Sequence, residues 1–334
     1  MKYNIAIDMG STNTVIFKNE VGVALVEPTL VLLDGNSKKN SVIAYGKDAL
    51  NEYSQIKDNL QLVEPIRDGV IADKEIAKGL LKHYLDKVCE KPLFRGNLVW
   101  LLPSSISQND RNEFINLGYA LGYKNVDVLP SPVASLQELE VEYNNPYSHV
   151  IVDIGGGVTD IAVVYKGKVV QGCSVGFGGK DIDKSIKNYL IENYNICLTD
   201  KHCEDIKMYL SSIIPNDLIS YELDNSGRDV YSNEKINISA QALRPIFTEF
   251  YDRVVGAINT VLKMCNSQII NDIQKTGIYL VGGMSKVVGI DKYIRSKLGI
   301  NVYVDNNPQN TTIWGVEKLF NEPQKLSYLI ELNN

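Results

Sequence analysis

The chain has 334 residues, of which 44% are apolar and 22% are charged, and its formal net charge is −6. This length suits two domains of ordinary size, and the composition is typical of a globular protein. The acidic balance argues against a nucleic-acid partner, because binding to a phosphate backbone needs clustered Lys and Arg. No apolar run is long enough to span a membrane, and a strand is expected within the first few residues, so we expect neither a membrane span nor a signal peptide.

The five cysteines are scattered along the chain and form no CxxC pair. An odd number without paired spacing is typical of reduced thiols, so we expect a cytoplasmic protein without a disulfide framework. His202 and Cys203 are adjacent, but no second pair completes a metal-ligand set.

The first half of the chain alternates between strand and helix patterns. Residues 1–30 have the Val- and Ile-rich character of strands, and the polar stretch 34–41 indicates a loop. Residues 73–88 have apolar side chains at helical spacing. The next predicted elements are a strand at 97–103, a helix at 108–123, a strand at 125–130 and a helix at 131–143. Ser131 and Pro132 suit the N-cap and the first helical position of that helix.

The second half continues this alternation. Residues 150–164 predict a strand, a glycine turn and a second strand, and another strand and glycine-rich turn precede a helix at 183–194. Pro245 lies in an amphipathic stretch at 240–265 and predicts a helix start near Arg244. The other predicted elements are a helix at 202–213, strands within 216–239, a strand–turn–helix unit at 277–299, a strand at 300–308 and a last helix at 310–320. The whole pattern predicts an α/β fold with helices covering the sheets.

Two stretches share one pattern of acid, any residue, glycine, three residues and threonine: Asp8–Thr14 and Asp153–Thr159. Each stands between two apolar runs, which predicts two similar strand–turn–strand hairpins. They can be two unrelated tight turns. They can also face each other across a cleft, with backbone N–H groups that hold phosphates and acids that hold a hydrated Mg²⁺.

A third glycine turn follows an apolar strand in "YLVGGMSK" (Tyr279–Lys286), where Ser285 can cap a helix. Such a turn lets the backbone approach a flat ligand or a phosphate. As the third turn of this kind it fits an adenosine pocket. The chain has no GxxxxGK[ST] motif and no GxGxxG opening a βαβ unit, so a P-loop or Rossmann enzyme is not supported.

Taken in order, these motifs resemble the actin, heat-shock-chaperone and sugar-kinase ATPase superfamily, and more closely the MreB family of bacterial actins. The matching stretches are "EPTLV" (27–31), "IRDGVIAD" (66–73), "VDIGGGVTDIAVV" (152–164), "SVGFGGKDID" (174–183), "EDIK" (204–207), "GRD" (227–229) and "LVGG" (280–283). They cover nearly the whole chain in the family's order.

The resemblance implies an actin-like fold of two large domains, each split into two subdomains around a nucleotide cleft. The first domain would comprise residues 1–138 with an insertion at about 31–65, and a helix at 309–330 would return to it. The second would comprise residues 139–308 with an insertion at about 176–244.

The resemblance also implies a site for ATP or ADP with Mg²⁺. Asp8 and Asp153 would hold Mg²⁺ through water. The phosphates would be wrapped by Gly10, Ser11, Thr12, Asn13, Gly155, Gly156 and Gly157. The ribose and base would lie against Glu204 and Lys207, and the adenine would be lined by Gly282, Gly283 and Met284.

Two departures from the family pattern concern hydrolysis. The family usually has two Glu at the start of the helix after "VDVL", and the second, which orients the attacking water, is Ser131 here. A serine hydroxyl is a poor base near neutral pH. The family's Thr-Thr-Glu after the glycines is Val158-Thr159-Asp160, with a shorter acid. We therefore predict a nucleotide-binding protein with low ATPase activity.

Family members form straight antiparallel double filaments, usually at the inner face of the cell membrane, so the resemblance implies self-association and a role in cell shape or motility. The altered Ser131 also suggests co-assembly with a more active paralogue. Leu93 and Phe94 lie between two basic residues and suit shallow insertion into an anionic leaflet, although they can equally pack locally.

Two other classes share the superfamily. A small-molecule kinase needs a catalytic Asp base and usually substrate-binding insertions, and neither signature is found. A chaperone-type ATPase would carry a C-terminal peptide-binding domain, for which we expect no space after the last helix. Sedimentation with and without ATP separates these classes, since only the filament predicts pelleting.

Overall fold

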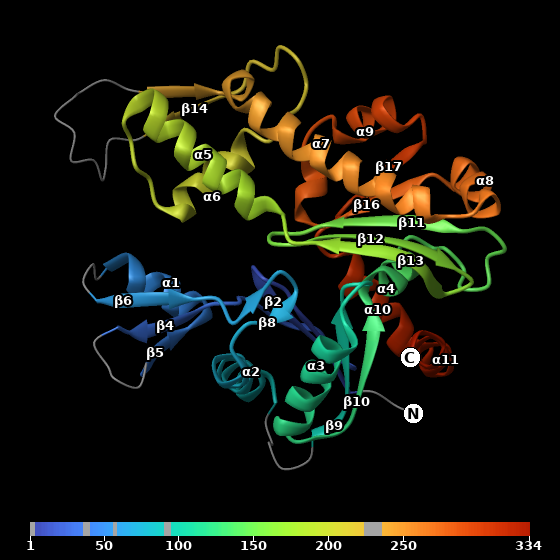
Figure 1. The fold of residues 1–334 in the computed structure, drawn as a ribbon. Helices are drawn as coiled ribbons and strands as arrows, with labels where there is room; N and C mark the ends of the chain where they lie inside the picture. The colour runs from blue at the N-terminus through green and yellow to red at the C-terminus, as the bar shows by residue number, and fades with distance from the viewer. Residues whose placement is uncertain (1–3, 36–40, 56–58, 90–94, 224–235) are drawn as a thin grey trace.

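The structure is a computed structural model that describes residues 4–35, 41–55, 59–89, 95–223 and 236–334 (Figure 1). Strands and helices alternate along the chain, which confirms the predicted α/β class. Two five-stranded sheets and the helices around them account for most of these residues.

The first sheet has the strand order β10-β9-β1-β2-β3. β1 pairs antiparallel with β2 and parallel with β9, so the first predicted hairpin lies at the centre of the sheet. Helices α2 and α3 pack on one face, where they form a core with the sheet. The bounds are β1 Ile5–Met9, β2 Asn13–Lys18, β3 Gly22–Pro28, β9 Arg95–Leu102, β10 Tyr123–Pro130, α2 Lys74–Val88 and α3 Gln108–Ala120.

Helix α2 shows how local sequence produces this layer. Asp73 caps its N-terminus, since the Ile76 N–H donates to the Asp73 carboxylate at 3.0 Å. The side chains at helical spacing, from Ala77 to Leu85, are buried against the sheet. The helix predicted at 73–88 is therefore confirmed.

The second sheet has the strand order β13-β12-β11-β16-β17. β11 pairs antiparallel with β12 and parallel with β16, which repeats the arrangement of the first sheet. A large core forms where α7, α8 and α9 cover its outer face, and it continues beside the sheet between α5, α6 and α7 (Figure 1). The bounds are β11 His149–Ile154, β12 Thr159–Tyr165, β13 Lys168–Val175, β16 Ile278–Val281, β17 Val302–Val304, α5 Gly179–Tyr194, α6 Asp200–Tyr209, α7 Ala240–Met264, α8 Ser267–Thr276 and α9 Ile290–Leu298.

Three helices lie between the two sheets: α4 (Ser131–Glu138), α10 (Thr311–Asn321) and α11 (Pro323–Asn333) (Figure 1). Their apolar side chains form a central core with residues from both sheets. α4 and α10 touch through their backbones, because a Cβ at Gly315 would lie 2.6 Å from the carbonyl carbon of Ala134. The two halves of the molecule thus share one core.

The remaining strands form small sheets at the outer ends. β4 (Val31–Asp34) pairs with β5 (Val42–Tyr45) and β6 (Leu60–Val63), and α1 (Gly46–Gln55) covers them. The two-stranded sheets are β7 Ile66–Arg67 with β8 Val70–Ile71, and β14 Ser220–Leu223 with β15 Ile236–Ser239. A 3-10 turn, η1, spans Gly283–Lys286. The domain limits implied by the resemblance stay a prediction.

Helix α7 begins earlier than predicted, and the expected start near Arg244 is wrong. It runs without a break through Pro245. Ser239 caps it, since its hydroxyl accepts from the Ala242 N–H at 3.2 Å. Leu243 and Phe247 are fully buried on the two sides of the proline, so core packing outweighs the single backbone hydrogen bond that Pro245 cannot make.

Four other points of the sequence analysis also need correction. α8 was not predicted, and α11 follows the helix expected to be the last. Ser131 is the first residue of α4 rather than its cap; Pro130 is the N-cap and no side chain caps this end. The helix ends at Glu138, because the chain turns there into a left-handed residue at Glu140.

Candidate functional site

The two predicted hairpins have the same turn geometry. In the first, the Gly10 N–H donates to the carbonyl of Asn13 at 3.0 Å; in the second, the Gly155 N–H donates to the carbonyl of Val158 at 2.9 Å. A Cβ on Gly10 would lie 3.1 Å from the carbonyl oxygen of Asn13, and a Cβ on Gly155 would lie 3.1 Å from that of Val158. Glycine therefore suits this close turn in both hairpins. The internal repeat read from the sequence is therefore a repeat of backbone structure.

The tips of the two hairpins meet between the halves of the molecule. A Cβ on Gly156 would overlap the hydroxyl of Thr12, and a Cβ on Gly157 would lie 2.9 Å from the Cβ of Ser11. The hydroxyls of Ser11 and Thr12 are buried and have no hydrogen-bond partner among the described residues. Buried hydroxyls are normally paired, so two orphaned donors at this point fit a ligand that accepts hydrogen bonds.

Each hairpin carries an acid at the end of its first strand. Burial raises the pKa of Asp8 to about 6. Burial raises the pKa of Asp153 to about 7, with smaller contributions from the negative charges of Asp8 and Asp160. Two buried acids that resist ionisation are suited to a divalent cation, which favours the charged form of both.

These acids fit Mg²⁺ held largely through water. The described residues contain no group of three or more His, Cys, Asp and Glu side chains placed to enclose a metal ion. Mg²⁺ usually keeps several waters and binds through one or two carboxylates and phosphate oxygens, which matches a two-carboxylate site beside the hairpin tips.

The third glycine turn joins the same site. Gly282 has a φ of +84° and packs so closely on the second hairpin that a Cβ would lie 2.5 Å from the carbonyl oxygen of Ile154. A Cβ on Gly283 would meet nothing within 4 Å, so this glycine borders open space. The side chain of Met284 lies against Gly179, where a Cβ would be 2.9 Å from its sulfur.

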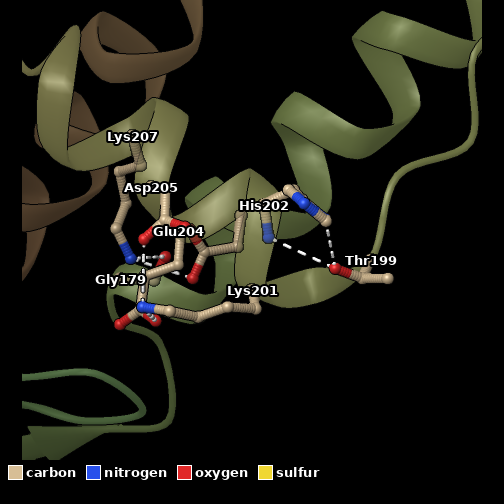
Figure 2. Close-up of polar contacts among 8 residues, drawn as sticks. Gly179, Thr199, Lys201, His202, Glu204, Asp205 and Lys207 are labelled. Atoms are coloured by element: carbon tan, nitrogen blue, oxygen red, sulfur yellow. Dashed lines mark hydrogen bonds and ion pairs between the residues drawn. The ribbon is translucent and has the colours of Figure 1, made fainter. Parts of the chain in front are cut away.

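Helices α5 and α6 carry a charged cluster (Figure 2), and Gly179 at its edge lies against Met284 of this turn. The Lys207 ammonium is buried and lies 2.8 Å from Asp183 and 3.2 Å from the carbonyl of Gly179. Glu204 is more exposed and pairs with Lys201 at 3.1 Å. The sequence reasoning named Glu204 and Lys207 as site residues but not Asp183, although Asp183 is the last residue of the matching stretch "SVGFGGKDID".

The second oxygen of Asp183 is buried and has no hydrogen-bond partner. Burial raises the pKa of this carboxyl, while Lys207 acts in the opposite direction. A buried, unpaired carboxylate oxygen suits a ligand hydroxyl or amine. Its sequence signal was its place at the end of the matching stretch 174–183, in the first turns of a helix that follows a glycine-rich turn.

Ser131 lies at the N-terminal end of α4, directly after β10. Its carbonyl accepts from the Ser135 hydroxyl at 3.0 Å, and that hydroxyl also contacts Thr312 of α10 at 2.9 Å. Helix α10 thus holds α4, and this contact fixes the position of Ser131 at the start of the helix.

Thr159 and Asp160 are both engaged in the structure. The Thr159 hydroxyl donates to the carbonyl of Phe177 at 2.9 Å. The Asp160 carboxylate accepts from the N–H and the hydroxyl of Ser104, each at 2.8 Å, and from the hydroxyl of Ser174 at 2.5 Å. Because Ser104 follows β9 of the first sheet, Asp160 joins the two halves of the molecule.

The residues expected to touch a membrane, Leu93 and Phe94, lie outside the described residues. Within the part of the chain that the structure describes, no helix is both long and apolar enough to cross a bilayer.

Two five-stranded sheets with repeated topology, a shared central core and two glycine hairpins that meet tip to tip define an actin-like protein. The family model described as "MreB/Mbl protein" matches residues 2–328. The chain belongs to this family.

Curated relatives agree with this assignment. The chain is 29% identical over 326 residues to cell shape-determining protein Mbl of Bacillus subtilis, covering 97% of each chain. It is 27% identical to cell shape-determining protein MreB of Escherichia coli, covering 91% of this chain and 89% of that protein. These relatives are actin-like cell-shape proteins, so the family is cytoskeletal.

Solved structures show the same fold. MreB5 of Spiroplasma citri bound to ADP has a TM-score of 0.87 and 27% identity, covering 98% of each chain. The same protein bound to AMPPNP has a TM-score of 0.86. A MamK double helical filament has a TM-score of 0.77 at 18% identity, covering 95% of this chain and 98% of that one, and supports the fold alone.

Proposed function

We propose that this protein binds ATP and ADP with Mg²⁺ between its two hairpins and assembles with further copies into a cytoskeletal filament. One observation carries the proposal: two hairpins of equal geometry meet tip to tip, with orphaned hydroxyls at the contact and an acid beside each. Spiroplasma MreB5, which has this fold, is bound to ADP and to AMPPNP in its solved structures.

Each part of the site has a chemical task in this proposal. Backbone N–H groups and hydroxyls of Gly10–Asn13 and Gly155–Gly157 bind phosphate oxygens. Asp8 and Asp153 orient the waters around Mg²⁺, which neutralises the phosphate charge. Gly283 and Met284 accept the base, and Asp183, Glu204 and Lys207 form the polar wall near the sugar.

Hydrolysis is slow in this proposal because Ser131 replaces the acid that would align and deprotonate the attacking water. Asp160 does not replace that acid in the present geometry, since its oxygens already accept from Ser104 and Ser174. Nucleotide binding would therefore favour assembly, and turnover would lag behind it.

Assembly and location rest on the relatives. MreB and Mbl are named for determining cell shape, and MamK forms a double helical filament. We propose an antiparallel double filament in the cytoplasm that acts in cell shape or motility, alone or together with a paralogue. Contact with an anionic membrane through Leu93 and Phe94 is part of this proposal.

The experiment is phosphate release measured alongside pelleting in Mg-ATP, for the wild type, Ser131→Glu and Ser131→Gln. We expect the wild type to pellet with little phosphate release. Ser131→Glu should release phosphate roughly 100-fold faster, the usual scale of a general base. Ser131→Gln, which has the same length but accepts no proton, is the control and should stay slow. Rapid release by the wild type would refute the assignment of Ser131.

Membrane contact needs a separate test. The wild type should co-sediment with anionic liposomes and not with neutral ones, whereas Leu93→Ser combined with Phe94→Ser should remain in the supernatant. Equal binding of the wild type and the double variant would remove these residues from the proposal and leave nucleotide binding unaffected.

A further inference from the structure

Lys180 joins the two halves of the molecule at the hairpins. It belongs to the first turn of α5, and its backbone N–H donates to the carbonyl of Gly156 in the second hairpin at 2.8 Å. Its ammonium group donates to the carbonyl of Ser11 in the first hairpin at 2.6 Å and lies 2.8 Å from the carboxylate of Glu64. One residue therefore touches both hairpins.

The contact with Ser11 fixes the direction of a peptide group. The Ser11 carbonyl and the Thr12 N–H belong to the same planar unit and point in opposite directions. When Lys180 holds the carbonyl, the Thr12 N–H is turned away from Lys180. A cation on the carbonyl also polarises the peptide, which makes the N–H a better donor to an anion.

Glu64 holds Lys180 in place for this contact. It lies between β6 and β7 in the first half of the molecule, so the ion pair crosses from one half to the other. The Lys180 side chain is 28% exposed, and a pair at this level of exposure contributes little to stability by itself. Its effect is to orient the ammonium group.

The chain after Glu64 also packs across the same boundary. A Cβ on Gly176 would lie 3.0 Å from the carboxyl carbon of Asp68, and a Cβ on Gly69 would lie 3.5 Å from the side chain of Val158. The turn of β7 and β8 therefore lies against the second hairpin. Lys180 reaches Ser11 only while these surfaces are together.

We propose that Lys180 is a positioning residue of the phosphate site, which orients the Ser11–Thr12 peptide of the first hairpin from the opposite half of the molecule. The inference rests on the proposed nucleotide function. It adds that phosphate binding is strongest when the halves are closed, because the first hairpin receives its orientation from the second half. Lys180 itself need not touch the nucleotide.

The test is calorimetric titration of Mg-ATP into the wild type, Lys180→Met and the control Lys184→Met. Met keeps the length of the side chain and removes the charge, and Lys184 is an exposed lysine of the same helix. We expect Lys180→Met to weaken binding about tenfold, the scale of one charge-assisted hydrogen bond. Lys184→Met should stay within twofold of the wild type.

A charge exchange separates positioning from simple bridging. Lys180→Glu should weaken binding more than Lys180→Met, because a carboxylate would face the Ser11 carbonyl. Combining Lys180→Glu with Glu64→Lys restores an ion pair across the halves but leaves the Ser11 carbonyl without a donor. We expect the thermal unfolding midpoint of this double variant to recover while the weak Mg-ATP binding persists. Recovery of binding would overturn the positioning role and leave only a bridge.

The same experiment also distinguishes failure of this inference from failure of the proposed function. If the wild type does not bind Mg-ATP, the proposed function fails and the inference falls with it. If the wild type binds and a folded Lys180→Met binds equally well, only the inference is overturned. Lys180→Arg keeps a charged donor, so its Mg-ATP affinity should stay within about threefold of the wild type. This variant shows whether the loss in Lys180→Met comes from the missing charge rather than from misfolding.

Discussion

The turns of the two hairpins share one backbone geometry, but the first has side chains at its tip where the second has glycines. In the aligned pattern Ser11 corresponds to Gly156, and Thr12 corresponds to Gly157. The contacts cross: Gly156 meets Thr12, and Gly157 meets Ser11. The side chains of the first hairpin occupy the space that the glycines of the second leave free, so the repeat works because it is not an exact copy.

The hairpins differ again directly after their threonines. Val15 pairs with Asp8 in the first hairpin, whereas Asp160 pairs with Asp153 in the second. Asp160 adds a negative charge that contributes to the higher pKa of Asp153. It also accepts three hydrogen bonds that attach the second hairpin to Ser104 and Ser174. Asp160 therefore ties the second hairpin to the first half through Ser104, whereas the first hairpin is tied to the second half through Lys180.

The largest effect should come from making the hairpins alike. Gly156→Ser combined with Gly157→Thr places side chains where Thr12 and Ser11 already lie, and overpacking of this kind costs about 1–3 kcal/mol per site. We expect Mg-ATP affinity, measured by calorimetry, to fall by roughly 100-fold. Gly256→Ser on α7, where a Cβ would meet nothing within 4 Å, is the matched control. Unchanged affinity in the double variant would show that the tips separate when nucleotide binds.

The next effect concerns the paired acids and pH. Folding raises the pKa of Asp8 from 3.8 to about 6 and that of Asp153 from 3.8 to about 7. A raised folded-state pKa contributes stability that is full below the unfolded value and is lost as pH rises through the folded value. Without Mg²⁺ and nucleotide, the free energy of unfolding should therefore fall between about pH 4 and 7, by about 3 kcal/mol for Asp8 and about 4 kcal/mol for Asp153.

Urea unfolding in EDTA at several pH values measures this slope. Asp8→Asn should remove the loss of stability centred at the lower pH, because an amide does not ionise. Asp153→Asn should remove the loss centred at the higher pH for the same reason. Addition of Mg-ATP at pH 7 should restore stability through binding to the folded state. A pH profile that rises across this range in the apo protein would contradict the assignment.

A smaller effect is expected from giving the second hairpin the residue of the first. Asp160→Val removes the acceptor of the Ser104 N–H and leaves buried donors unpaired, which should lower the free energy of unfolding by about 2 kcal/mol. The same change should lower the pKa of Asp153, since one nearby negative charge is lost. Urea unfolding and carboxyl titration by NMR measure the two results. A stable variant with an unchanged Asp153 would show that Asp160 only fills space.

The smallest effect should be equal in the two hairpins. The Thr14 hydroxyl bonds with that of Thr29 at 2.9 Å, and the Thr159 hydroxyl donates to the carbonyl of Phe177 at 2.9 Å. Thr14→Val and Thr159→Val each remove one buried hydrogen bond at nearly constant volume, so each should cost about 1 kcal/mol in urea unfolding. A much larger loss at Thr159 alone would contradict this equivalence and show that its hydrogen bond to Phe177 stabilises the fold more than the Thr14–Thr29 bond does.

The features predicted from the sequence are those determined by nearby residues. Periodic apolar positions predicted α2, and the shared spacing of acid, glycine and threonine predicted both hairpins. The turn at Gly282 was predicted to bring the backbone close to a ligand, which stays a prediction; the structure places this glycine against Ile154 of the second hairpin. Each of these depends on a few consecutive residues whose backbone preferences act locally.

The features missed depend on contacts between distant parts of the chain. Ser104 and Asp160 are 56 residues apart, and Lys180 and Ser11 are 169 residues apart. Neither contact has a spacing or motif that marks it. Pro245 shows how such contacts can override a local preference. Proline normally disfavours a helix interior, but burial of the flanking residues outweighs that preference, so the predicted helix start was wrong.

The central core has a consequence for the molecule as a whole. The apolar side chains of α4, α10 and α11 pack against both sheets. The inner face of each sheet is therefore covered only when both halves are present. Cutting the chain between Leu139 and Ser148 and producing the pieces separately would leave each with a broad apolar face in water. The shared core therefore couples the stability of the two halves, because unfolding one half would expose apolar side chains of the other.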